Sequence, residues 1–178
     1  MDAGLPGPRL EQGWALAAQG QDEQGLALMH QGLAALQATG TWLLVAEYLL
    51  LLAEAYGRIR QAEEGLRRLT EALARVDATR DHYYAAEGYR LQGELRLWQV
   101  APDEPQAEWC FHQALTVARR QHARSLELRA AMSLSRLWQQ QGKCDEAREL
   151  LAPIYGWFTE GFDTADLQEA KALLEELS

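Results

Sequence analysis

The residues that most often hold metals or act as redox groups are few and scattered in this 178-residue chain. Its two cysteines, Cys110 and Cys144, are far apart. Cys110 precedes His112 by two residues, a spacing that places their side chains on different sides of a helix. Neither a zinc pattern nor a disulfide framework results. The sequence therefore predicts no metal site and no bound cofactor.

Motifs for catalysis are also missing. None of the four serines lies in the strand–turn–helix setting of a hydrolase nucleophile. The two lysines, Lys143 and Lys171, do not follow a glycine-rich phosphate-binding loop. Adjacent carboxylates such as Glu63 and Glu64 are expected on solvated helix faces. We therefore expect that the chain is not an enzyme.

Aromatic and arginine side chains offer a different chemistry, because Tyr, Trp and Arg commonly anchor protein interfaces. The candidate binding surface comprises Trp42, Tyr48, Tyr56, Tyr83, Tyr84, Tyr89, Arg90, Arg96, Arg129 and Arg136. The alternative is that these rings pack in the core. Trp98 and Trp138, each in a Leu-Trp pair near a predicted helix end, are assigned to the core. One of the adjacent Tyr83 and Tyr84 is expected to face solvent or a partner.

The composition indicates which elements must position these residues. The chain holds 30 leucines and 29 alanines against only 13 Val, Ile and Thr residues. Helices favour Leu and Ala, whereas strands favour β-branched side chains, so a sheet protein is excluded. Because the chain carries a net charge of −9, a nucleic acid is not an expected partner. Residues 89–140 carry a net charge of +2, which indicates either a docking surface or a solvated helix face.

No segment indicates a membrane partner or export. The most apolar stretch, residues 42–53, is interrupted by Glu47 and is shorter than the roughly 20 residues that span a bilayer. The first residues lack the basic start and apolar run of a signal peptide. Unpaired cysteines fit a reducing compartment. We therefore expect a cytoplasmic protein.

A repeat of about 40 residues runs through the chain. In each copy a small residue is followed four positions later by a large apolar one: Gly25 and Met29, Gly65 and Leu69, Ala107 and Phe111, Ala147 and Leu151. The small residue lets a neighbouring helix approach closely, and the large one fills the space between helices. Turn residues precede each anchor at Gly20, Pro102 and Gly142, but Arg60 stands at the second turn, which predicts a turn of different shape.

These observations predict an all-α, tetratricopeptide-like α-solenoid of about four helical hairpins plus a C-terminal capping helix. The predicted domains are a disordered N-terminus at 1–8, helical hairpins at 9–162 (9–40, 41–80, 81–122 and 123–162) and the capping helix at 163–178. For the capping helix, Asp163 is the predicted N-cap, and Phe162 and Leu167 are predicted to form a hydrophobic staple. Its apolar stripe is predicted to comprise Leu167, Ala170, Leu174 and Leu177.

Several segments resemble a known group of proteins. They are residues 87–96 (EGYRLQGELR), 110–121 (CFHQALTVARRQ), 126–131 (LELRAA), 141–143 (QGK) and the closing 155–167 (YGWFTEGFDTADL). They are similar to the C-terminal tetratricopeptide-like region of large bacterial signalling proteins, identified as adenylate or guanylate cyclases, or as transcriptional regulators, with a central predicted ATPase. The resemblance covers the chain from about residue 13 onward, and the closing motif is its most specific part.

The resemblance implies a non-catalytic protein–protein interaction or regulatory module that binds a peptide or a partner domain. No catalytic residue is carried over, because the cyclase and ATPase activities of such proteins belong to upstream domains. The alternative is a regulatory domain that senses a small molecule and controls a linked ATPase or cyclase. An open groove with exposed Tyr and Arg would favour the first hypothesis, and an enclosed pocket near Tyr56, Tyr84 and Trp98 the second.

Overall fold

The chain is helical throughout the part described by a computed structural model, residues 6–38, 45–79 and 84–178, where no strand occurs. The high Leu and Ala content therefore predicted the fold class correctly. The chain divides into two compact units, which we describe separately. Unit 1 comprises Met1–Tyr84 with Trp98–Pro102, and unit 2 comprises Ala85–Leu97 with Asp103–Ser178.

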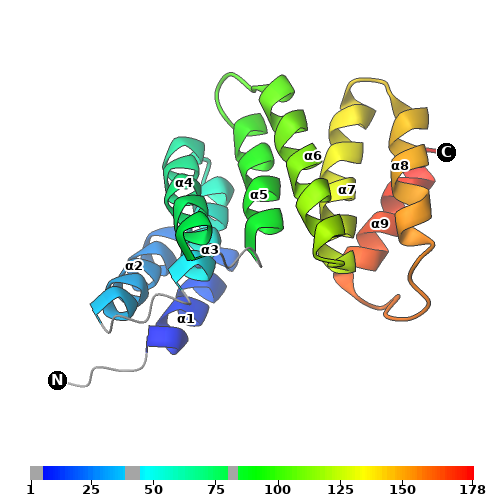
Figure 1. Cartoon of the computed structure of the whole chain (residues 1–178). Helices are drawn as coiled ribbons and strands as arrows, with labels where there is room; N and C mark the ends of the chain where they lie inside the picture. The colour runs from blue at the N-terminus through cyan, green and yellow to red at the C-terminus, as the bar shows by residue number, and fades with distance from the viewer. Residues whose placement is uncertain (1–5, 39–44, 80–83) are drawn as a thin grey trace. The chain divides into compact units, whose positions relative to one another are not determined.

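Unit 1 consists of two helical hairpins (Figure 1). Its helices are α1 (Pro6–Ala18), α2 (Asp22–Ala38), α3 (Val45–Arg58) and α4 (Ala62–Thr79). Helix α1 packs on α2 and α3 packs on α4, while α3 also contacts α1 and α2. Helix α1 begins at Pro6, inside the segment 1–8 that was predicted to be disordered; proline is well tolerated in a first helical turn.

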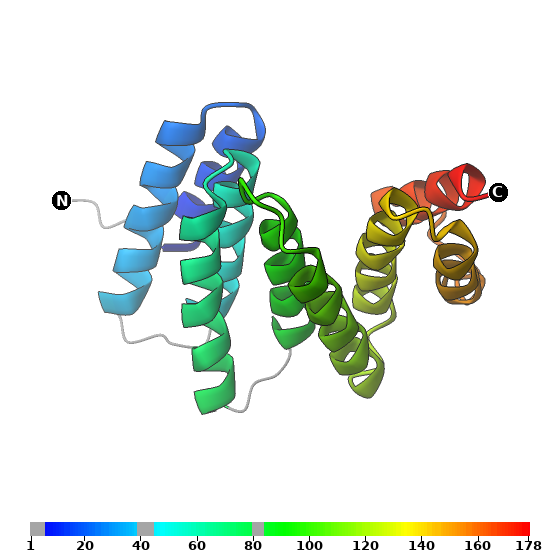
Figure 2. The same ribbon diagram turned by 90° about the horizontal axis from the view of Figure 1, so that it is seen from above.

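Unit 2 consists of two further hairpins and a closing helix. Helix α5 (Ala85–Leu97) packs on α6 (Glu104–Arg120), and α7 (Arg124–Gln140) packs on α8 (Cys144–Tyr155). Helix α9 (Ala165–Glu176) contacts both α7 and α8 (Figure 2). The buried side chains of α9 are Leu167, Ala170 and Leu173, and Leu177 directly after the helix is also buried, whereas Leu174 is only partly buried. The helix therefore covers the last hairpin as expected, with Leu173 in place of Leu174 at the centre of its stripe.

The small and large residues of the 40-residue repeat are buried, as predicted. Met29, Leu69, Phe111 and Leu151 are completely inaccessible to solvent. At Gly25 the reason for a small residue is direct: an added Cβ would lie 2.5 Å from the carbonyl oxygen of Gly13 on α1. Two backbones meet there, so no side-chain movement could relieve the clash, and the repeat anchor determines how closely α1 and α2 approach.

Three of the four turns within the hairpins share one backbone geometry, including the one that was predicted to differ; the α5–α6 turn at Pro102 does not share it. Gly20, Arg60 and Gly142 have φ angles of 82°, 60° and 77°. In each turn the amide of the following residue donates to a carbonyl five residues earlier, for example Gln61 N to Tyr56 O at 2.9 Å and Lys143 N to Trp138 O at 2.8 Å. This is the Schellman arrangement that ends many helices. The prediction of a different shape at Arg60 is therefore wrong, because the backbone adopts the left-handed conformation even without glycine.

Replacing Arg60 with glycine is expected to raise the free energy of unfolding by about 1 kcal/mol, because glycine adopts a positive φ without steric cost. The gain is reduced by the greater freedom of glycine in the unfolded chain. Gly142→Ala is the matched opposite change and should destabilise the protein. Urea denaturation followed by circular dichroism measures both effects. A less stable Arg60→Gly variant would show that contacts of the Arg60 side chain outweigh the backbone strain.

The start of α9 differs from the sequence-based prediction. The N-cap is Thr164 rather than Asp163, and no side chain caps the helix. The Thr164 hydroxyl donates instead to the carbonyl of Gly161 at 2.7 Å. The Phe162 ring lies 6.0 Å from the ring of Tyr155, between centroids, in a tilted arrangement. Thr164, whose hydroxyl donates to a carbonyl of the preceding loop, therefore takes the N-cap position that was predicted for Asp163.

Candidate functional site

Of the three predicted aromatic residues of unit 1 that the structure describes, two lie in its core. Tyr48 and Tyr56 are only 5% and 7% exposed. Tyr84 is half-buried, and its hydroxyl donates to Glu47 Oε2 at 2.9 Å. Trp42 and Tyr83 lie outside the described residues. For Tyr48 and Tyr56 the geometry agrees with the core-packing alternative, so we leave them out of the surface proposed below.

Tyr56 has a partner inside unit 1. Its hydroxyl lies 2.7 Å from His30 Nε2, and the two rings meet edge to face. Burial lowers the pKa of His30, and the charge of Arg68 lowers it further. A neutral imidazole is therefore favoured at this position. The pair joins α2 to α3 and explains why a tyrosine is present in this part of the core.

In unit 2, Arg90 lies buried between two carboxylates of its own helix. Its Nη2 is 2.6 Å from Glu87 Oε1, its Nε is 2.9 Å from Glu87 Oε2, and Nη1 contacts Glu94. Ser133 of α7 donates to the same Glu94 oxygen at 2.9 Å. Burial alone would raise the pKa of Glu87, but the hydrogen bond and charge of Arg90, with the charge of Arg129, hold it below its usual value. Glu87 and Glu94 therefore join α5 to α7, and Arg90 between them, which is 6% exposed, offers no exposed guanidinium.

Two further predicted arginines extend this network across α7. Arg129 Nη1 is 3.2 Å from Glu87 Oε1, and its Nε is 4.0 Å from Asp166 Oδ2 of α9. Arg136 Nη2 is 2.8 Å from Glu169 Oε2 of α9. We call this surface of α5, α7 and α9 the first-helix face; its charged residues are Glu87, Arg90, Glu94, Arg129, Arg136, Asp166 and Glu169. Three arginines meet four carboxylates there, so this face is not basic.

A groove of about 340 Å³ lies on the first-helix face, between α7 and α9. Its lining includes Arg136, Gln139, Glu169, Leu173 and Glu176. Gln139 Nε2 lies 3.4 Å from Glu176 Oε2, and together with the Arg136–Glu169 pair this contact orders both edges of the groove. The groove therefore presents donors and acceptors beside the apolar side chains of Ala172 and Leu173.

The remaining predicted residues, Tyr89 and Arg96, contact α6. The Tyr89 ring meets Trp109 edge to face with centroids 6.1 Å apart, and Trp109 is 49% exposed. Arg96 Nη1 lies 3.7 Å from Asp103 Oδ2.

Of the two tryptophans assigned to the core, Trp138 is partly buried and donates to Glu108 Oε1 at 2.8 Å. Trp98 is 45% exposed, so its assignment to the core is wrong.

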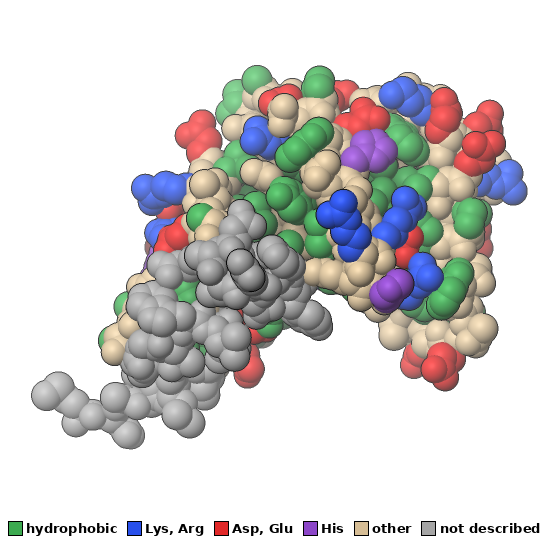
Figure 3. Space-filling model, in the orientation of Figure 1, with side chains coloured by type: hydrophobic (Ala, Val, Ile, Leu, Met, Phe, Trp, Pro, Cys, Tyr) green, Lys and Arg blue, Asp and Glu red, His purple; other side chains and the backbone are tan. Residues whose placement is uncertain are grey.

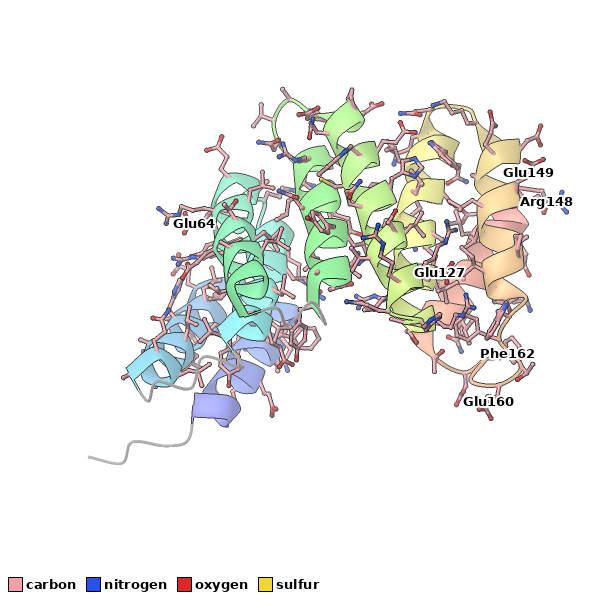
Figure 4. The ribbon with its side chains drawn as sticks, in the orientation of Figure 1. Glu64, Glu127, Arg148, Glu149, Glu160 and Phe162 are labelled. Atoms are coloured by element: carbon pink, nitrogen blue, oxygen red, sulfur yellow. The ribbon has the colours of Figure 1, made fainter. Side chains whose placement is uncertain are left out.

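A second group of residues in unit 2 was not selected from the sequence. Glu127, almost completely buried at the start of α7, accepts from Arg119 Nε at 2.9 Å and from Arg124 Nη1 at 2.8 Å (Figure 4). The Arg124 guanidinium lies 3.7 Å above the ring of Trp157, which is 62% exposed. In the sequence, the net positive charge of residues 89–140 was the feature that indicated this group of arginines.

Groups suited to catalysis or metal binding are scarce in the described residues. Cys110 is buried and donates to Gln92 Oε1 at 3.5 Å, and burial raises the pKa of its thiol, which disfavours the reactive thiolate. Within the described ranges no three His, Cys, Asp or Glu side chains gather closely enough to hold a metal ion. Likewise, none of the helices described is both long and apolar enough to cross a membrane.

Two solved structures share the fold of this chain. One contains TPR-like (tetratricopeptide-repeat-like) repeats of a Podosopora anserina protein described as a kinesin light chain; it matches with a TM-score of 0.70 and 19% identity over 96% of this chain and 83% of that chain. A variant of those same repeats matches with a TM-score of 0.67 and 19% identity, over 96% and 91%. No protein-family model and no curated protein matches the sequence. The likeness establishes an all-α, TPR-like α-solenoid fold of helical hairpins with a closing helix.

Proposed function

We propose that this chain is a non-catalytic module that binds a peptide or a partner domain through the first-helix face of unit 2. The groove between α7 and α9, with its ordered charged edges, is the observation that carries this proposal. Repeat arrays of helical hairpins characteristically bind partners on an extended surface of this kind. The partner is a protein rather than a nucleic acid or a membrane, and the module acts in the cytoplasm.

The ion pairs of the first-helix face suit it to recognition. A side chain that is already held in one conformation loses little entropy when a partner binds. Arg136 is held by Glu169, yet 43% of its side chain stays exposed, so it can contact a partner without rearranging. Ser133 and Arg129 extend the ordered contacts from α7 toward α5 and α9. A partner with donors and acceptors matched to this pattern, rather than a uniformly acidic one, fits the face best.

The resemblance to bacterial signalling proteins, from about residue 13 onward, supports a larger regulatory setting for the module. In that setting it would link an upstream ATPase or cyclase to a protein signal. The closing motif, residues 155–167, forms the end of α8, the loop that follows and the first turn of α9. This motif forms one end of unit 2. The resemblance therefore includes surface residues of the module as well as core residues.

A second candidate function is a small-molecule-sensing regulatory domain that controls a linked ATPase or cyclase. The size of the α7–α9 groove, about 340 Å³, favours it, because ligand pockets commonly measure roughly 300 to 1,000 Å³. Its charged edges would select a polar ligand. Such a ligand would raise the melting temperature of the wild-type protein and not that of an Arg136→Glu variant.

Reversing the charge of Arg136 is expected to weaken partner binding at least tenfold. The new carboxylate would face Glu169 and Glu176 at the groove edge and would repel the acceptors that Arg136 had engaged. The measurement uses the purified chain as bait in extracts of its source cell, followed by titration of each captured protein against the variants. An ATPase or cyclase among the captured proteins would support the signalling setting.

The matched control is Arg148→Glu, which makes the same charge change on the outer side of α8 in the same unit (Figure 4). It should leave the affinity unchanged. If both variants bind a captured partner as tightly as the wild type, the first-helix face is not the binding surface. If nothing is captured specifically by the wild type, the interaction function itself is contradicted.

A further inference from the structure

A basic and aromatic surface lies at the end of unit 2 where α6 ends and α7 begins. We call it the α6–α7 patch and define it by Arg119, Arg120, Arg124 and Trp157. Arg119 and Trp157 are more than half exposed, and Arg120 is also exposed. Figure 3 shows Lys and Arg side chains gathered with a histidine over these helix ends. The patch is remote in sequence from Arg136 and Glu169 and shares no residue with the first-helix face.

A buried carboxylate organises the patch from below. The Glu127 side chain, 5% exposed, receives one hydrogen bond from Arg119 and one from Arg124. The Arg124 guanidinium also covers the face of the Trp157 ring, a favourable cation–π contact. Two arginines and one tryptophan are therefore held in fixed orientations on an accessible surface. Arg and Trp in such settings are typical hot-spot residues of protein interfaces.

The charge of the patch is opposite to that of the chain as a whole. Its three arginines exceed the one buried carboxylate of Glu127 by two charges, while the chain carries −9. A positively charged surface attracts acidic groups and repels basic ones. Charge complementarity therefore indicates an acidic occupant.

A cavity of about 210 Å³ adjoins the patch through Ser125, the residue next to Arg124. Its apolar lining includes Leu128, Phe158 and Leu167, and its lining also includes Glu160 and Asp166. The cavity thus offers room for an apolar side chain beside the arginines. The two carboxylates disfavour acidic groups next to them.

We propose that the α6–α7 patch and this cavity together bind a short segment of a partner protein that carries acidic residues on one side of a single large apolar residue. The acidic residues pair with Arg119, Arg120 and Arg124. The apolar side chain enters the cavity between Leu128, Phe158 and Leu167. The repulsion from Glu160 and Asp166 orients the segment, so that its acidic side lies toward α6. This site is additional to the α7–α9 groove and shares only Asp166 with the first-helix face.

The test uses fluorescence anisotropy with a labelled synthetic peptide that contains three glutamates followed by two alanines and one leucine. The wild-type chain should bind this peptide at least tenfold more tightly than a peptide with three lysines in place of the glutamates. Replacing the peptide leucine with alanine should weaken binding about tenfold, and raising the salt concentration should weaken it further. Equal binding of the glutamate and lysine peptides would overturn the proposal.

The protein variant for this test is Arg119→Gln with Arg120→Glu. Glutamine retains a donor for Glu127, so unit 2 should stay folded, and circular dichroism checks this. The double variant should bind the glutamate peptide at least tenfold more weakly than the wild type, while Arg148→Glu, the control, binds it normally. Unchanged binding by the folded double variant would contradict the proposal.

Two other occupants are distinguished by the same proteins. If Arg136→Glu weakens peptide binding and the double variant does not, the peptide binds the first-helix face, and the α6–α7 patch proposal is overturned while the proposed function holds. If sedimentation shows that the wild type self-associates and that the double variant is monomeric, the occupant is the acidic surface of a second copy, which also overturns the proposal.

Discussion

Replacing Arg90 with leucine is expected to lower the free energy of unfolding by about 3 kcal/mol at pH 7. The substitution leaves Glu87 and Glu94 largely buried without the guanidinium that lies between them. An unpaired buried carboxylate costs much more than an exposed one, because water cannot replace the lost partner. Urea denaturation at several pH values measures the effect.

The pH dependence distinguishes this mechanism from a simple loss of packing. In the wild type the pKa of Glu87 is held below its usual 4.5, so this group contributes stability above that pH, and the contribution is lost as the pH falls through the folded-state pKa. Without Arg90, burial should raise the pKa of Glu87 above 4.5. The variant should therefore lose less stability than the wild type on acidification, and the difference between them should begin to shrink above pH 4.5, where Glu87 of the variant takes up a proton.

Two variants serve as controls for the Arg90 prediction. Arg67→Leu removes an arginine that also pairs with a glutamate on its own helix, but Arg67 is 70% exposed, so the change should leave the free energy of unfolding nearly unchanged. Glu87→Gln and Glu94→Gln, added to Arg90→Leu, should recover much of the lost stability because no buried charge remains. A deficit that is independent of pH and is not recovered would show that Arg90 acts through packing alone.

Deleting residues 163–178 is expected to destabilise unit 2 by about 3 kcal/mol or more and to cause self-association. Helix α9 buries Leu167, Leu173 and Leu177 against α7 and α8, and its removal exposes the apolar surface that they cover. It also removes Asp166 and Glu169, the partners of Arg129 and Arg136. Thermal unfolding and light scattering measure the two consequences.

Point substitutions separate the packing of α9 from the loss of chain length. Leu173→Asp places a charge at a buried position, whereas Ala172→Asp places the same charge at the adjacent exposed position. The first should lower the melting temperature strongly, and the second should leave it nearly unchanged. A truncated protein that stays monomeric with the wild-type melting temperature would show that α9 is not needed to close the last hairpin.

The sequence predicted the helical hairpins well because their causes are local. The Leu and Ala content, the small and large residues 40 residues apart, and the glycines at Gly20 and Gly142 each act within a few residues or one helix pair. The shape of the turn at Arg60 was predicted wrongly because the residue type at that position was the only evidence in the sequence. Its left-handed conformation is imposed by two helices that must pack antiparallel, and this demand exceeds the small steric cost of a side chain.

The candidate site depended on contacts that local patterns do not contain. Arg90 and Arg136 were both predicted as exposed binding residues, yet the fold buries Arg90 beside Glu87 and places Arg136 against Glu169, 33 residues away. Ser133 likewise meets Glu94 from 39 residues away. The Arg124–Trp157 contact joins the start of α7 to the loop after α8. Composition, the repeat and the turn residues predicted the helical hairpins. The packing of helices distant in sequence decided which charges are paired, which are buried and which remain exposed for a partner, because burial and pairing depend on neighbours in space.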